Sequence, residues 1–227
     1  MIFFEKSQPA PTSLATEKQK ASGSYNQPDV LERLIADFAN KCYLCEQDNL
    51  TSMNIEHLRP HRGDPNLKFD WNNLFLACPH CNNIKSDGYD DILNYTVESD
   101  QVESRIKLKM DPFPISEVEV TVKRTDARTL QTAELLKAVF NGTTLMKTRE
   151  AENLNKRLED EIHQFQQLLR GYVNAKKHND PEALQDFNRK IRYSLQKTSP
   201  FTSFKRWIIR ENDKRNAEFG HLFETDK

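Results

Sequence analysis

Four cysteines arranged in two pairs carry the clearest chemistry in this sequence. Cys42 and Cys45 form one C-x-x-C knuckle, Cys78 and Cys81 form a second, and no cysteine is left over. Four thiolates in two such pairs are the ligand set of a closed tetrahedral zinc site. A redox C-x-x-C motif is the alternative, but two pairs together favour a structural zinc. His80, between the cysteines of the second pair, is expected at the surface.

The segment between the two knuckles contains residue types that could hydrolyse a phosphodiester bond. That reaction needs an activated water, a cation beside the phosphate oxygens and help for the leaving oxygen. His57 suits the role of general base, because a neutral imidazole accepts protons near physiological pH. Glu56 and Asn82 offer hard oxygen ligands, which suit a catalytic magnesium or manganese ion rather than zinc. A lone histidine on a strand is more often structural, so the prediction depends on the surrounding pattern.

The order of motifs from Cys42 to Lys85 resembles the HNH endonuclease family. The motifs are Glu-His-x-x-Pro, then Asn-Asn-Leu, then C-x-x-C-Asn with a later Lys. The resemblance implies two strands and a helix around one metal ion, with His57 as the catalytic base. It also implies that Asn73 holds the His-bearing strand in place and that Lys85 lies near the phosphate or the helix start. Many relatives have Asp in place of Glu56, whose side chain is one methylene longer. The resemblance therefore implies that the metal position is shifted or that Glu56 adopts a bent rotamer.

Basic residues follow the Glu-His pair and are candidate contacts to nucleic acid. Arg59, His61 and Arg62 are predicted to face phosphate groups. Nothing in the HNH motif reads a base, so DNA and RNA are not separated at this point. The alternatives are an RNA-directed nuclease that acts on a structured RNA such as tRNA, or a non-catalytic zinc-binding module. A binding module would have no need of Glu56, His57 and Asn82 together, which favours the enzyme.

Further segments resemble PtuB, the family of HNH subunits of Septu-type and retron-linked anti-phage systems. They are Tyr-Leu-Cys-Glu at the first knuckle, Gln-Thr-Ala-Glu-Leu-Leu at 131–136 and Phe-Asn-Gly at 140–142. The resemblance implies a PtuA-like ATPase subunit as partner, together with a nucleic-acid substrate. In retron-linked systems it also implies a reverse transcriptase with its RNA and DNA. The ATPase is expected to keep the nuclease quiet until infection.

The elements that must position these residues can be predicted from hydrophobic periodicity. A helix from Pro28 leads to the first knuckle, a strand is expected around Ile55 and a helix near Cys81. Alternating valines predict a strand over 117–123, and four helices are expected after it. These are 127–140 with a left-handed cap at Asn141-Gly142, a long apolar stripe from Leu154 to Tyr172, a helix opened by Asp180-Pro181-Glu182, and a helix after Pro200.

The sequence therefore predicts an α+β protein with a small zinc-stapled ββα-metal HNH core and a mostly helical C-terminal half. Residues 1–27 are expected to form a flexible N-terminal arm that packs little. Residues 28–125 form the zinc-containing HNH nuclease domain with a flanking helix and strands, and 126–227 form a helical region that docks a partner. In the last helix Arg206, Arg210 and Lys214 step by four, which predicts one basic face.

Composition limits the classes of protein that this chain can belong to. Lys plus Arg number 33 and Asp plus Glu number 34, which excludes a protein that coats nucleic acid by charge excess. No signal-peptide core follows the apolar start, and no stretch is long and apolar enough to span a bilayer. We expect a cytoplasmic protein without a membrane partner, in a reducing compartment that keeps its thiols free for metal.

Overall fold

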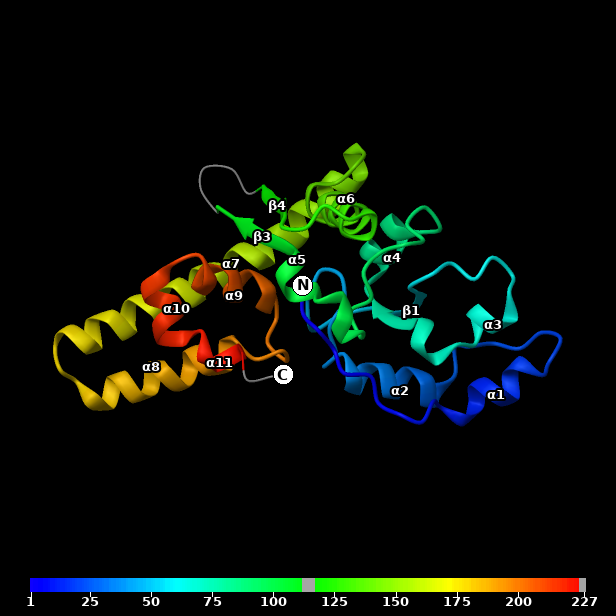
Figure 1. The fold of residues 1–227 in the computed structure, drawn as a ribbon, viewed down its shortest axis with the longest axis horizontal. Coiled ribbons are helices and arrows are strands. Elements are labelled where there is room, and N and C mark those ends of the chain that lie inside the picture. The colour runs from blue at the N-terminus through cyan, green and yellow to red at the C-terminus, as the bar shows by residue number, and fades with distance from the viewer. Residues whose placement is uncertain (112–116, 225–227) are drawn as a thin grey trace.

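The computed structural model describes residues 1–111 and 117–224 of the chain. Figure 1 shows the N-terminal helices and the segment around β1 at one end and the α7–α8 hairpin at the other. A second small sheet and helix α6 lie between these two ends. Among the described residues, helices dominate and the strands form two separate two-stranded sheets. This mixed content confirms the predicted α+β class.

The predicted core consists of two strands and one helix. Strand β1 (Asn54–His57) pairs antiparallel with β2 (Leu74–Ala77), and His57 lies opposite Leu74. Helix α4 (Pro79–Lys85) follows β2 directly, and the thiol of Cys78 accepts a hydrogen bond from the Cys81 N–H at its N-terminus. The connection from β1 to β2 contains the short helix α3 (Pro65–Lys68) and the 3-10 turn η1 (Trp71–Asn73). Asp64 and Asp70 cap these two turns, because each carboxylate accepts an N–H from two residues further on.

The N-terminal segment packs against this core, which differs from the loosely packed arm expected from the sequence. Helix α1 (Thr12–Lys18) buries Leu14, and α2 (Pro28–Asp37) begins at the predicted proline. The side chains of Met1, Ile2 and Phe4 are also buried. The Phe4 ring contacts the Phe38 ring in a tilted arrangement, with ring centroids 4.9 Å apart. Burying each large apolar side chain stabilises the fold by about 1.5–3 kcal/mol. This gain holds the segment in place although its sequence shows little helical or strand periodicity.

The second sheet and its covering helix follow the ββα core. Strand β4 (Val118–Val122) confirms the predicted strand and pairs antiparallel with β3 (Ile106–Met110), which the sequence analysis did not predict. The 3-10 turn η2 (Glu98–Asp100) and the short helix α5 (Val102–Arg105) lead into β3. Helix α6 (Ala127–Asn141) packs on β4.

Helix α6 ends at Gly142, but its cap is not the predicted left-handed one. Gly142 has φ of 73° and ψ of 166°, so its φ is positive while its ψ lies outside the left-handed helical region. A Cβ atom here would lie 2.5 Å from Cα of Thr148 in the next helix. The glycine therefore allows both the positive φ and the close approach of the next helix.

The predicted apolar stripe lies on a single long helix. Helix α7 (Leu145–Lys177) packs antiparallel against α8 (Pro181–Ser194), whose N-cap Asp180 accepts the Ala183 N–H as predicted. The chain then forms α9 (Thr202–Arg210), α10 (Asp213–Phe219) and α11 (His221–Glu224). The first part of the stripe joins the hydrophobic cluster of the ββα core, and the second part joins a separate cluster with α8 to α11. The larger cluster includes residues from all three predicted segments, so the boundaries at 27 and 125 stay predictions.

The predicted basic face is not one continuous surface, because Arg206 and Arg210 lie on α9 with internal partners, whereas Lys214 is exposed on the next helix, α10. Lys205 and Arg206 are only 1% exposed, because α9 packs against β3 and α7. The Arg206 guanidinium donates to the Glu103 carboxylate at 2.9 Å, and Arg210 reaches the same carboxylate at 3.3 Å. The Trp207 indole donates to the Ile106 carbonyl oxygen at 3.2 Å. These cations and the indole hold α9 inside the molecule.

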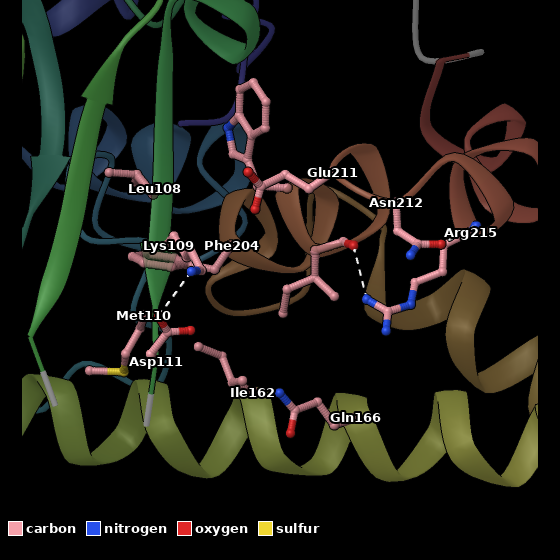
Figure 2. Close-up of a pocket in the computed structure, with 12 residues that line it drawn as sticks. Leu108, Lys109, Met110, Asp111, Ile162, Gln166, Phe204, Glu211, Asn212 and Arg215 are labelled. Atoms are coloured by element: carbon pink, nitrogen blue, oxygen red, sulfur yellow. Dashed lines mark hydrogen bonds and ion pairs between the residues drawn. The ribbon is translucent and has the colours of Figure 1, made fainter. Parts of the chain in front are cut away.

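A hollow of about 240 Å³ lies beside α9, and Figure 2 shows its lining. Leu108 and Met110 of β3, Ile162 of α7 and Phe204 of α9 form its apolar part. None of its lining residues belongs to the predicted nuclease or zinc site.

Candidate active site and metal centre

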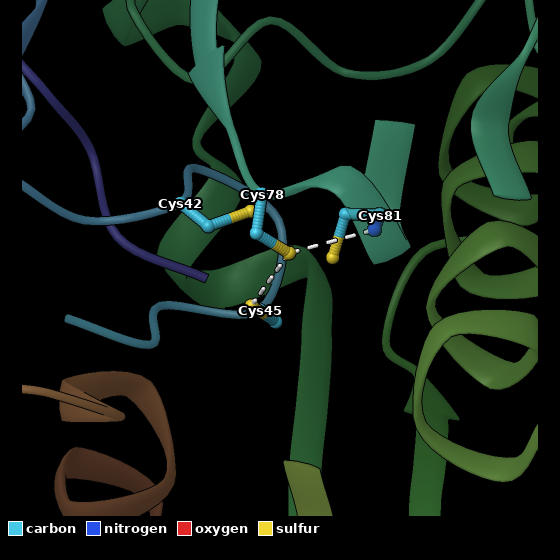
Figure 3. A group of neighbouring side chains, drawn as sticks. All are labelled: Cys42, Cys45, Cys78 and Cys81. Carbon is cyan, nitrogen blue, oxygen red and sulfur yellow. Dashed lines mark hydrogen bonds between the residues drawn. The ribbon is translucent and has the colours of Figure 1, made fainter. Parts of the chain in front are cut away.

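The four cysteines meet as the sequence predicts. Figure 3 shows Cys42 and Cys45 in one loop facing Cys78 and Cys81 at the start of α4. Their Sγ atoms all lie within 4.8 Å of one another, and all four residues are buried. The Cys45 and Cys78 sulfurs are 3.9 Å apart. Tetrahedral coordination with Zn–S bonds of about 2.3 Å requires S···S separations of about 3.8 Å, so the cluster fits zinc.

The electrostatic surroundings of these thiols also suit a bound cation. Burial raises the pKa of the Cys45 and Cys81 thiols well above the usual value. Hydrogen bonds from Cys42 and the other thiols instead hold the pKa of Cys78 far below it. Buried thiols of raised pKa stay neutral unless a cation stabilises the thiolate, which zinc would do here.

Both knuckles are connected to the helical half of the chain. Glu46, which follows Cys45, accepts the Phe201 N–H at its backbone oxygen (3.1 Å) and the Ser203 N–H at its carboxylate (2.9 Å). His80 contacts the Val139 carbonyl oxygen and the Glu150 carboxylate, each at 2.8 Å. The expectation that His80 is a surface residue is therefore wrong, because α6 and α7 pack over it. The zinc knuckles link the ββα core to the helices.

His57 lies at the end of β1 with its imidazole fixed at one nitrogen. Its Nε2 lies 3.0 Å from the backbone oxygen of Lys68. A carbonyl oxygen only accepts hydrogen bonds, so Nε2 carries the proton and Nδ1 is left as the basic nitrogen. Burial lowers the pKa of His57 to about 4. The ring is therefore neutral at physiological pH and able to accept a proton.

Asn73 supports the loop that follows His57. Its side-chain amide donates to the backbone oxygens of Arg59 (2.9 Å) and Leu67 (3.0 Å), and its oxygen accepts the Arg59 N–H at 2.8 Å. The Asn73 backbone oxygen also accepts the Leu58 N–H at 2.9 Å. These contacts hold both ends of the loop between β1 and α3, and the side chain is buried.

The comparisons with known proteins agree with this geometry. Residues 42–88 match the HNH endonuclease family. The HNH segment thus includes both knuckles, β1, β2 and α4. The chain is also similar to the Septu protein PtuB of Bacillus thuringiensis, with 30% identity over 87 residues. That alignment covers 36% of this chain and 34% of the relative, so the chain spans about a third of the length of the relative that it matches. Among the described residues, no helix is both long and apolar enough to cross a membrane.

Glu56 of the HNH segment is enclosed rather than open to a metal ion. One carboxylate oxygen accepts the Tyr43 hydroxyl at 2.7 Å, and the other lies 2.7 Å from the Lys85 ammonium. Burial raises the pKa of Glu56 to about 7, although Lys85 acts in the opposite direction. Both carboxylate oxygens therefore have protein partners, which does not fit the predicted role as a magnesium or manganese ligand. The only sequence feature that points to Tyr43 is its place inside the first knuckle.

Lys85 occupies the interior of the HNH segment. Its ammonium is fully buried and donates to the His57 backbone oxygen at 2.8 Å as well as to Glu56. A group so enclosed contacts no phosphate in this arrangement. Lys85 instead ties the end of α4 to the strand that carries His57.

The remaining predicted residues lie nearer the surface. Asn82 is half-buried on the first turns of α4, and the described part of the chain offers its side-chain amide no hydrogen-bond partner. Arg59 is exposed, His61 is half-buried and packs against His57 with ring centroids 4.7 Å apart, and Arg62 pairs with Asp90 at 3.2 Å. His61 therefore lies beside the His57 ring, and Arg59, two residues after His57 in the sequence, is exposed. Arg62 is held by its acidic partner, Asp90.

Proposed function

We propose that this chain is an endonuclease that hydrolyses phosphodiester bonds, with His57 as its general base. The fixed Nε2–H to Lys68 hydrogen bond is the observation that supports this role, because it leaves Nδ1 unprotonated. The lowered pKa of about 4 keeps that nitrogen available at neutral pH. The match of residues 42–88 to the HNH endonucleases supports the same chemistry.

The chain's own residues supply the proton transfer and its geometry. Nδ1 of His57 takes a proton from the attacking water, while Nε2 stays bonded to Lys68. Asn73 and Lys85 keep the backbone around His57 in place from two sides. We expect Arg59 to approach a phosphate, and the exposure of its side chain two residues after His57 supports this role. A general base in the correct position contributes on the order of a hundredfold to ten-thousandfold in rate.

A catalytic magnesium or manganese ion stays part of the proposal, with a reduced set of protein ligands. Such an ion would stabilise charge on the phosphate and on the leaving oxygen. Asn82 is available for this ion, whereas Glu56 is committed to Tyr43 and Lys85. Magnesium commonly keeps several waters and binds through few protein groups, which is compatible with one amide oxygen.

We further propose that the nuclease acts in anti-phage defence with a PtuA-like ATPase subunit. The similarity to the Septu protein PtuB supports this role. The first turn of α7 supports a docking surface in the helical half, because Leu145 and Met146 are 78% and 74% exposed. Met146 is four residues from Glu150, which contacts His80 between two zinc-binding cysteines. A partner bound there would lie one helical turn from the knuckle.

Two substrate classes remain within this proposal. Nothing in the arrangement around His57 distinguishes DNA from a structured RNA, and a retron reverse transcriptase is a further proposed partner rather than a requirement. A non-catalytic zinc module is the less favoured alternative. Such a module does not require a histidine whose Nε2 is held by a carbonyl oxygen so that Nδ1 is left unprotonated.

The test is cleavage of labelled DNA and of total RNA by the purified chain, alone and with its ATPase. We expect His57→Ala to abolish cleavage and to keep zinc content and the native circular dichroism spectrum, with a somewhat lower thermal unfolding midpoint because a buried, hydrogen-bonded ring is lost. His163→Ala is the matched control, because His163 is exposed on α7. Cleavage by His57→Ala at the parental rate, with magnesium present, would exclude the proposed base.

A further inference from the structure

We propose that Tyr25 is a positioning residue of the nuclease centre, which holds the imidazole of His57 from the side of the N-terminal segment. This inference rests on the proposed role of His57 and adds to it a residue outside the HNH segment. Tyr25 lies in the connection between α1 and α2. It is half-buried, and its ring faces the imidazole.

Three rings contact one another at this point. The Tyr25 and His57 centroids are 4.5 Å apart with an interplanar angle of 82°, an edge-to-face arrangement. His61 lies 4.7 Å from His57 and 6.4 Å from Tyr25. His61 is held in turn by the Gly63 N–H, which donates to its Nδ1 at 3.1 Å. The imidazole of His57 therefore has one neighbour from the N-terminal segment and one from its own loop.

Lys68 connects the N-terminal segment to the same imidazole. Its backbone oxygen accepts the His57 Nε2–H, and its ammonium donates to the Gly23 backbone oxygen at 2.8 Å. Gly23 is closely packed, because a Cβ atom there would lie 1.9 Å from the Glu17 backbone oxygen. Glu17 also accepts the Ser24 N–H at 3.0 Å. Contacts with Lys68 and with Glu17 thus fix the chain at Gly23 and Ser24, just before Tyr25.

The contact with the Tyr25 ring restricts the tilt of the His57 imidazole, which the hydrogen bond at Nε2 alone does not. A single hydrogen bond at Nε2 fixes one atom of the imidazole, but the ring can still tilt around it and displace Nδ1. Proton transfer needs Nδ1 within hydrogen-bond reach of the water, so a tilt lowers the rate. An aromatic pair of this geometry corresponds to about a threefold to tenfold change in an equilibrium or rate.

The first test observes His57 itself and does not need nuclease activity. Nitrogen NMR of the full chain, labelled at histidine, reports which ring nitrogen is protonated, and His57→Ala assigns the signal. We expect Tyr25→Ala to shift the His57 ring signals and to reduce the Nε2–H tautomer. Tyr25→Phe, which keeps the ring, should preserve them. Tyr193→Ala is the control, because that tyrosine is 65% exposed on α8.

The second test separates positioning from substrate binding. We expect Tyr25→Ala to lower kcat about threefold to tenfold with KM unchanged, and Tyr25→Phe to match the parent. Unchanged His57 signals in Tyr25→Ala would overturn the proposal. So would a raised KM with unchanged kcat, which would make Tyr25 a contact to nucleic acid. If the parent cleaves nothing, the proposed function fails, and the NMR signals still decide the role of Tyr25.

A second variant covers the case in which Tyr25→Ala fails to fold, as judged by zinc content and circular dichroism. Gly23→Ala keeps the tyrosine and moves the segment, since the added Cβ has no space beside Glu17. We expect it to shift the His57 ring signals in the same direction. Normal His57 signals in a folded Gly23→Ala protein would also count against the proposal.

Discussion

The Nζ atom of Lys85 lies 2.7 Å from the Glu56 carboxylate, in an ion pair that is closed off from solvent. The acid of the Glu-His motif therefore supports the strand that carries His57, the proposed general base, and does not face an open metal position. Glu56 joins β1 to α4.

Glu56→Gln should lower the free energy of unfolding by about 3 kcal/mol, since removing one partner leaves the other charge buried and unpaired. Urea unfolding measures this loss. Lys85→Met combined with Glu56→Gln should recover part of it, because a neutral pair of similar volume costs less than one unpaired charge. The magnesium concentration for half-maximal cleavage should stay unchanged in Glu56→Gln. A tenfold rise in that concentration would restore Glu56 as a metal ligand.

The purified chain should contain one zinc ion per molecule, held by Cys42, Cys45, Cys78 and Cys81. Cys78→Ser should lose zinc and fail to fold, because zinc sites of this type contribute about 10–16 kcal/mol, as much as the stability of a whole domain. Elemental analysis and circular dichroism measure both effects. His80→Gln is the matched control within the same knuckle and should keep zinc, with a loss of about 1–2 kcal/mol from its hydrogen bonds to α6 and α7. A Cys78→Ser protein with full zinc and full stability would contradict the assignment.

The acid limb of the pH–rate profile should lie well below the usual histidine range. The base acts in its neutral form, and burial lowers the pKa of His57 to about 4. The value of kcat/KM should therefore stay constant from about pH 7 to about pH 5 and fall tenfold per unit below about pH 4. Glu56→Gln is a useful background, because Glu56 itself has its pKa raised to about 7. An acid limb centred near 6.5 in that background would show that the imidazole is not buried as described.

Replacing Leu145 and Met146 together by Ser should weaken co-purification with the ATPase, because both side chains are exposed on the first turn of α7. Zinc content and unfolding should not change. Val173→Ser is the control, since Val173 is 61% exposed on the same helix, about 40 Å away at 1.5 Å per residue. Trp207 and Arg210 are poor test positions, as both are tied to internal partners. Undiminished binding by the double variant would place the docking surface elsewhere.

Local patterns predicted much of the fold correctly. The knuckles, the strand near Ile55, the strand over 117–123 and the helices from 127 onward depend on spacing or on periodicity within one element. Strand β3 (Ile106–Met110) was missed although it alternates over the same length as β4, because its Leu and Met favour helices whereas the three valines of β4 favour strands. The buried start of the chain has one usable signal in the sequence, the apolar run Met1-Ile2-Phe3-Phe4, which by itself does not indicate the surface that it packs against.

The site depended more on contacts that no local pattern encodes. The pairing of Glu56 with Lys85 and the burial of Arg206 against Glu103 join residues far apart in sequence. Basic residues at helical spacing usually indicate a solvent-exposed face. Only the three-dimensional structure reveals an acidic partner that buries them. Tyr25 stands alone between polar residues, so its place beside His57 could not be predicted from the sequence.

The hydrogen bonds from Glu46 and His80 to the helices limit which sequence exchanges between related proteins this fold can accept. Three hydrogen bonds join the knuckles to the helices, and all three must be kept together. They involve the Ser203 N–H, the Val139 backbone oxygen and the Glu150 carboxylate. A chimaera that takes its helical half from a divergent relative would have to keep the backbone N–H at position 203 in place to satisfy the buried carboxylate of Glu46. We therefore expect exchanges of the whole helical half to cost more stability than substitutions at the exposed start of α7.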